Sequence, residues 1–144
     1  MFWINEFVLD KKEKYQKWLE IAEYDLETAK IMLDSNRYIY VVFMCQQALE
    51  KLAKGIYVYS FDKEAKYTHN INLILEDVED ILKSKEYTGY ETFFSELTSY
   101  YIVGRYDAYK QNISDELKKE NTAEIFSRTK EAFLWLKSQV KLSD

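Results

Sequence analysis

The sequence predicts an all-α protein, an up-and-down bundle of four main helices plus a shorter fifth. Two features favour helix throughout. The 144 residues include no proline and only three glycines, so the chain has few of the residues that form hairpin turns and bulges in sheets. Apolar residues also recur at steps of three and four, the period of a helix. A chain of this length is expected to form one domain, residues 1–144, with its own core.

The first two helices are predicted to form an antiparallel pair. The first is expected from about Asp10 to Leu33 and the second from about Arg37 to Tyr59, with a polar break at residues 35–37. A connection this short brings consecutive helices side by side in opposite directions. Gly55, near the end of the second helix, weakens helicity but allows a neighbour to approach closely.

The central part of the second helix, residues 41–57, is apolar on more than one side. Six small or apolar residues form one stripe: Val41, Met44, Cys45, Ala48, Leu52 and Ile56. The other side carries four polar residues between Phe43 and Tyr57: Gln46, Gln47, Glu50 and Lys54. A helix that is apolar on several sides is usually covered on several sides, and an unpaired buried polar group costs about 1 to 3 kcal/mol. The polar side is therefore either a satisfied seam inside the bundle or part of a site or a subunit interface.

A third helix is predicted from Asn70 to Lys83, with Thr68 or Asn70 as its cap. His69, which precedes it, is the only histidine, so it cannot form a metal cluster. It is expected to be a boundary residue that hydrogen-bonds locally, with a role in a site as the alternative. The acidic residues of this helix, between positions 76 and 80, are expected to form a solvated face rather than a catalytic or ion-binding pair.

The fourth helix is predicted from about Tyr90 to Arg105 and the last from Thr122 to Lys141. Asn121, with a glutamate three positions later, resembles a capping box for the last helix. Between them lies a polar segment, residues 107–119, which is long for a loop in a compact bundle. Loops of that length often carry function.

Composition excludes several classes of protein. One cysteine forms no intramolecular disulfide, and the position of Cys45 on the apolar stripe predicts a core residue. Residues 1–10 are too short and too acidic for a signal peptide, and no run of 18 apolar residues spans a bilayer, so we expect a soluble cytoplasmic protein. The net charge of −5 argues against general polyanion binding. No glycine-rich phosphate loop, metal motif or nucleophilic triad is present, and no cofactor is predicted.

The end of the fourth helix is the remaining candidate site. Arg105 at a helix end, beside aromatic residues and a loop with Lys110, can hold a phosphate bidentately while rings stack on a base. The candidate nucleotide- or RNA-binding residues are Arg105, Tyr106, Asp107, Tyr109 and Lys110. The structural alternative is that Arg105 pairs with Asp107 or Glu50 and ties the bundle together.

Four pieces of the chain resemble the HEPN domain family, small helical bundles associated with nucleotides and RNA. The pieces are Trp18…Ala22…Asp25-Leu26…Ala29, Cys45-Gln46-Gln47-Ala48-Leu49-Glu50-Lys51-Leu52-Ala53-Lys54, Thr68-His69-Asn70, and Tyr100-Tyr101…Arg105-Tyr106. The resemblance covers about residues 15–136. It implies a homodimer and a companion protein of the nucleotidyltransferase type, as in toxin and antitoxin pairs.

Many members of the family are ribonucleases with an arginine followed four to six positions later by a histidine. Arg105 matches the arginine, but Tyr109, Lys110, Gln111 and Asn112 follow it and none is histidine. A histidine suits proton transfer at neutral pH, whereas a lysine is a poor general base. The leading hypothesis is therefore a module that binds nucleotide or RNA phosphate at a dimeric site around Arg105.

Two alternatives remain open. One is a metal-independent endoribonuclease of the toxin type, in which Arg105 is catalytic and His69 replaces the missing histidine. The other is a structural domain that binds a protein partner. In the leading hypothesis, Glu50 or Gln47 of the second helix orients Arg105, as supporting residues do in a preorganised site.

Overall fold

The structure is a computed structural model that describes residues 9–103 and 116–142. In these residues the chain forms six helices and no strand, which confirms the all-α prediction. Four long helices make the bundle and two short helices connect its second and third members: α2 (Lys11–Asp34), α3 (Tyr38–Phe61), α4 (Ile71–Leu75), α5 (Glu79–Leu82), α6 (Tyr87–Val103) and α8 (Lys119–Ser138). None of the described helices is both long and apolar enough to cross a membrane.

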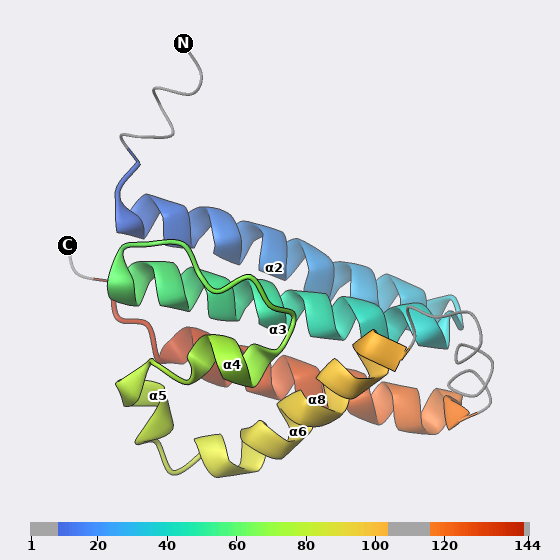
Figure 1. The fold of residues 1–144 in the computed structure, drawn as a ribbon. Coiled ribbons are helices and arrows are strands. Elements are labelled where there is room, and N and C mark those ends of the chain that lie inside the picture. Colours follow the sequence, from blue (N-terminus) through green and yellow to red (C-terminus); the bar gives the residue numbers. More distant parts are fainter. Residues whose placement is uncertain (1–8, 104–115, 143–144) are drawn as a thin grey trace.

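Helices α2 and α3 form the predicted antiparallel pair (Figure 1). The Asp10 carboxylate caps α2 by accepting a hydrogen bond from the Glu13 amide at 2.8 Å. The chain then reverses through Asn36, whose φ of 60° lies in the left-handed region. Asparagine tolerates that region better than most side chains, so a break of three residues is enough for the reversal.

Gly55 allows α2 and α3 to approach closely, as predicted. A Cβ atom at this position would lie 2.8 Å from the Cβ of Trp18 and 3.2 Å from a ring carbon of Tyr15. Both neighbours belong to α2, so a side chain at residue 55 would force the helices apart.

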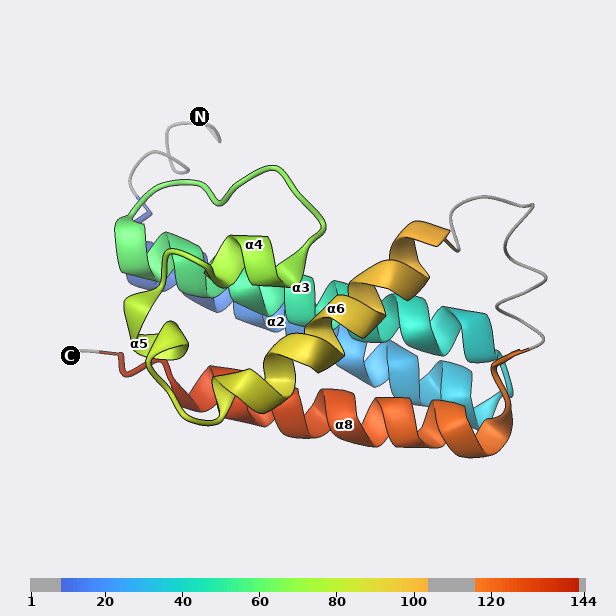
Figure 2. The same ribbon diagram turned by 60° about the horizontal axis from the view of Figure 1, so that its bottom comes forward.

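Helix α3 is the centre of the bundle. Figure 1 shows it between α2 and the layer of α4, α6 and α8, and in Figure 2 α4 and α6 lie in front of it. More than half of its residues are buried, and Gln46 and Glu50 are among them. Cys45 is also buried, and burial raises the pKa of its thiol to about 12, which fits the predicted core role.

The prediction of a single helix from Asn70 to Lys83 is wrong, because the first helix ends at Leu75 and a second begins at Glu79. The Lys66 ammonium holds the end of α4 by donating to the Leu73 carbonyl oxygen at 3.0 Å and by pairing with the carboxylates of Glu76 and Asp77. Glu79 also pairs with Lys83, so three of the four acidic residues expected to be solvated are paired, although their side chains remain about half exposed or more.

The predicted starts of the last two long helices are also corrected. Helix α6 begins at Tyr87 rather than Tyr90, because the Tyr87 ring is buried in the core and its hydroxyl donates to Asn72 Oδ1 at 2.9 Å. Helix α8 begins at Lys119, so Asn121 lies inside the first turn instead of capping it. Its Oδ1 accepts from the Lys118 amide at 2.6 Å, which satisfies that amide from within the helix.

We predict that Gly55→Ala destabilises the fold. Overpacking against Trp18 costs about 1 to 3 kcal/mol, and the gain in helix propensity recovers about 1 kcal/mol. The expected net loss is about 1 kcal/mol, a fall in Tm of a few degrees, measured by thermal unfolding followed by circular dichroism.

Gly89→Ala is the matched control, because a Cβ there meets nothing within 4 Å and the residue also lies in a helix. It is expected to leave Tm unchanged or to raise it. Equal Tm values for the two variants would show that α2 and α3 do not need a glycine at their contact.

Candidate functional site

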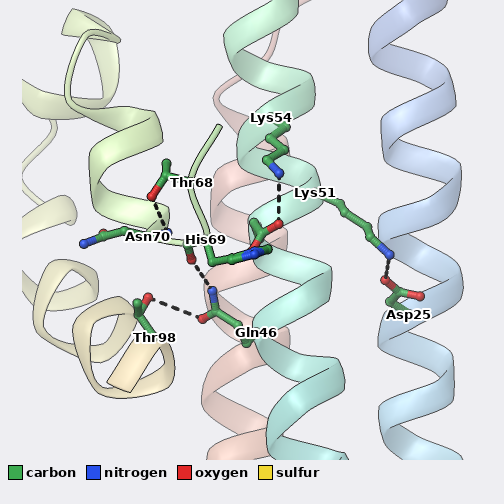
Figure 3. Close-up of polar contacts among 9 residues, drawn as sticks. Asp25, Gln46, Lys51, Lys54, Thr68, His69, Asn70 and Thr98 are labelled. Atoms are coloured by element: carbon green, nitrogen blue, oxygen red, sulfur yellow. Dashed lines mark hydrogen bonds and ion pairs between the residues drawn. The ribbon is translucent and has the colours of Figure 1, made fainter. Parts of the chain in front are cut away.

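A polar cluster lies where α3, the segment before α4 and α6 meet. We call it the His69 cluster, and it consists of six residues: Gln46, Glu50, Lys54, His69, Thr98 and Tyr101. The three residues of α3 are four positions apart, so they follow one line along the helix. Figure 3 shows this line of side chains facing the segment that carries His69.

The Glu50 carboxylate is the centre of the cluster. Its side chain is only 4% exposed, and its two oxygens bind different partners. Oε1 lies 3.0 Å from Nδ1 of His69, and Oε2 accepts from the Lys54 ammonium at 3.0 Å. A carboxylate this deeply buried needs compensating partners, and both of its neighbours can carry positive charge.

The contact with Glu50 determines which nitrogen of the His69 ring carries the proton in the neutral imidazole. Because the Glu50 carboxylate accepts, Nδ1 of His69 carries the proton, and in the neutral ring Nε2 is left as the acceptor. The His69 side chain is 41% exposed, and no partner for Nε2 exists among the residues that the structure describes. A ring held at one nitrogen and open at the other can exchange a proton with a ligand or donate to a phosphate.

Gln46 fixes the backbone that carries the histidine. Its Nε2 donates to the His69 carbonyl oxygen at 2.6 Å, and its Oε1 accepts from the Thr98 hydroxyl at 3.4 Å (Figure 3). Gln46 is fully buried, so without these bonds its unpaired amide would destabilise the fold. One side chain of α3 thereby connects the His69 segment to α6.

The residues on each side of His69 hold the local backbone. The Thr68 hydroxyl accepts from the Asn70 amide at 3.1 Å, and Asn70 Oδ1 accepts from the Leu73 amide at 3.2 Å. The second bond caps α4 with Asn70, one of the two caps that the sequence predicted. His69 is therefore held on the backbone side by the cap and by Gln46, and on the ring side by Glu50.

Tyr101 places the cluster beside the last turns of α6. Its ring centroid lies 5.0 Å from that of His69, with an interplanar angle of 51°. Tyr101 precedes Arg105 by one helical turn in the sequence. The fold therefore brings the only histidine to the same end of α6 that leads to the predicted arginine.

The structure describes only part of the predicted site. Arg105, Tyr106, Asp107, Tyr109 and Lys110 lie outside the described residues, so their role stays a prediction. Glu50 is in the cluster, bound to His69 and Lys54. Gln47 is half-buried and makes no hydrogen bond to the described part of the chain, so the orientation of Arg105 by either residue also stays a prediction.

His69 differs from its expected role, because the ring bonds to a residue 19 positions away rather than locally. From the sequence, Gln46 was expected only as part of the polar side of the second helix, and Thr98 was not predicted to belong to the site. The spacing of Gln46, Glu50 and Lys54 in α3 was a signal for the cluster, since residues four apart share a helix face. No pattern in the sequence indicated Thr98, because it meets Gln46 only through the packing of α6 on α3.

The fold and the cluster define a helical bundle in which side chains of the central helix α3 bind a histidine from the segment before α4. The family model described as HEPN domain matches residues 15–139, most of the chain. The protein therefore belongs to the HEPN domain family, as the resemblance implied. Comparisons with curated proteins and with solved structures found no match.

We predict that Glu50→Gln destabilises the fold by about 2 kcal/mol, because it removes the charge that compensates Lys54 and His69 in a buried setting. The value is below the usual 3 to 5 kcal/mol for breaking a buried pair, since His69 is partly exposed. Chemical denaturation in urea measures the change in unfolding free energy.

Glu79→Gln is the control, because it breaks an ion pair to Lys83 whose side chains are at least 75% exposed. Its effect is expected to stay within about 0.5 kcal/mol. If Glu50→Gln is as mild as this control, the Glu50 contacts do not hold the His69 segment in place.

Proposed function

We propose that this HEPN domain binds the phosphate of a nucleotide or RNA at the end of α6, through Arg105 with Tyr106, Asp107, Tyr109 and Lys110. The observation that carries the proposal is the His69 cluster, which holds a half-exposed imidazole beside Tyr101, one helical turn before Arg105 in the sequence. Arginine supplies bidentate donors that fit a phosphate, and an imidazole nearby adds a further donor when protonated.

The net charge of −5 is compatible with a local anion site. Within the cluster, the single charge of Glu50 is balanced by Lys54, so the ring of His69 adds positive charge whenever it binds a second proton. A local site of this kind binds a phosphate without the clustered lysines and arginines that non-specific polyanion binding requires.

Family membership adds two further parts to the proposal. The domain acts as a homodimer, in which two copies of the α6 end face one another, and it pairs with a companion protein of the nucleotidyltransferase type. Light scattering of the purified protein tests the first part, and a strictly monomeric species contradicts it.

We predict that Arg105→Ala weakens binding of a short 5′-phosphorylated RNA or a nucleoside triphosphate by about ten- to one hundredfold. This range corresponds to losing a hydrogen bond to a charged group, about 1.5 to 3 kcal/mol. Isothermal titration calorimetry at moderate salt measures it.

Arg128→Ala is the matched control, since Arg128 is a partly exposed arginine on α8, where it pairs with Glu96 and covers the Phe93 ring. It is expected to bind as the unaltered protein does. Absence of binding by the unaltered protein, or equal affinities for Arg105→Ala and Arg128→Ala, contradicts the proposal and favours a domain that binds a protein partner.

A second candidate is a metal-independent endoribonuclease. The contact between Glu50 and His69 favours it, because a carboxylate on Nδ1 leaves Nε2 to take the proton from the ribose 2′-hydroxyl. The oxygen so activated attacks the neighbouring phosphorus, a cyclic phosphate forms as the bond to the 5′-oxygen breaks, and the 5′-oxygen takes a proton from the imidazolium or from water. Arg105 stabilises the added negative charge on the phosphate.

This second candidate predicts that the protein degrades single-stranded RNA in the presence of a chelator and that His69→Ala lowers the rate by at least one hundredfold. Gel analysis of a labelled RNA measures the rate. His69→Ala is also tested for binding, since a purely binding role for the ring changes affinity without any cleavage to lose. Intact RNA after incubation with the unaltered protein contradicts the nuclease and leaves the binding proposal standing.

A further inference from the structure

A row of four rings runs across the junction of α3 and α6. Tyr40 contacts Phe43 with ring centroids 6.1 Å apart, and Phe43 contacts Tyr101 at the same separation. Tyr101 in turn contacts His69. The row therefore connects the His69 cluster to the start of α3, near the turn from α2 (Figure 1).

The rings are accessible to different extents. Tyr40, at the far end, is 54% exposed, although burying a large aromatic ring is favourable. Phe43 and Tyr101 are half-buried, and the His69 side chain is 41% exposed. The row is therefore a surface feature rather than part of the closed core, and its most exposed ring is the one farthest from the cluster.

A cavity opens beside the far end of the row. It has a volume of about 510 Å³, and the described residues that line it are Met32, Ser35, Arg37, Tyr40 and Met44. This size lies within the range of small-ligand pockets, which are mostly apolar with a few polar groups. Two flexible thioethers, an aromatic face, a hydroxyl and a guanidinium suit a flat heteroaromatic ring with polar edges.

The charges around the row favour an anionic ligand. Arg37 at the cavity forms no ion pair with the described residues, and the acid nearest to it in the sequence, Asp34, is paired with Lys30 at 2.8 Å. At the other end, Lys54 neutralises Glu50 and His69 can be protonated. A phosphate backbone along the row thus meets a guanidinium without an ion pair to the described residues at the cavity, and an imidazole at the cluster.

We propose that the row formed by Tyr40, Phe43, Tyr101 and His69 is a base-binding surface for single-stranded RNA, and that the cavity beside Arg37 and Tyr40 accepts one unstacked base. The inference rests on the proposed function, because it extends the phosphate site at the end of α6 to the bases of the same strand. Aromatic side chains stack on bases of any sequence, and this requires bases that are free of a duplex.

Fluorescence anisotropy of the full chain with a labelled ten-nucleotide single-stranded RNA, and with the same RNA in a duplex, tests the inference. Tyr40→Ser is expected to weaken single-strand binding about tenfold, the loss typical of one stacking ring, and to leave duplex binding unchanged. Tyr24→Ser is the matched control, because Tyr24 is 70% exposed on α2 and is not part of the row. It is expected to bind as the unaltered protein does.

Phe43→Leu is a second test of the same binding, since leucine keeps the apolar packing but offers no ring face to a base. Its affinity for the single strand is expected to fall while thermal unfolding confirms that the variant is folded. Binding by Tyr40→Ser and Phe43→Leu equal to that of Tyr24→Ser overturns the inference, as does equal affinity of the unaltered protein for duplex and single strand.

The failure of the inference is distinguishable from that of the proposed function. Loss of binding with Arg105→Ala but not with Tyr40→Ser overturns the base-binding surface alone. Loss with Tyr40→Ser but not with Arg105→Ala supports the base-binding surface and contradicts the phosphate role of Arg105. Absence of RNA binding by the unaltered protein overturns both.

Discussion

The buried carboxylate of Glu50 imposes the strongest constraint on this structure. Helix α3 is covered on several sides, so each buried polar group along it needs a partner within the protein. Glu50 takes Lys54 from its own helix and His69 from the segment before α4. The Gln46 amide is satisfied by hydrogen bonds to the His69 carbonyl oxygen and from the Thr98 hydroxyl. Among the described residues, no buried side-chain nitrogen or oxygen lacks a partner. The same bonds that avoid this cost also bring three separate parts of the chain together.

The position of the histidine follows from these bonds. Gln46 fixes the backbone of residue 69, Glu50 fixes one ring nitrogen, and Tyr101 lies against the ring. Among the described residues, Nε2 of this partly exposed ring has no partner, and the ring lies near the end of α6. An arrangement that serves the stability of the bundle thus also produces a preoriented proton acceptor and donor.

Most of the fold could be predicted from the sequence, because long helices depend on local periodicity. Helices α2 and α3 begin within one residue of the predicted positions, and Asn70 caps α4 as one of the two caps predicted there. The break between α4 and α5 could not be predicted, because the pattern continues through it and Lys66, which holds it, lies outside the pattern. The start of α8 was misplaced because Asn121 acts from inside the first turn.

By itself the sequence determined the all-α class, the antiparallel α2–α3 pair, the close approach at Gly55 and membership of the HEPN family. Each of these depends on spacing along the chain or on a short motif. Only the tertiary structure decided which polar residues of α3 act together, and that His69 is one of their partners. The reason is physical: a buried carboxylate or amide selects its partner by distance in the folded bundle, and residues 19 or 52 positions apart have no shared period in the sequence.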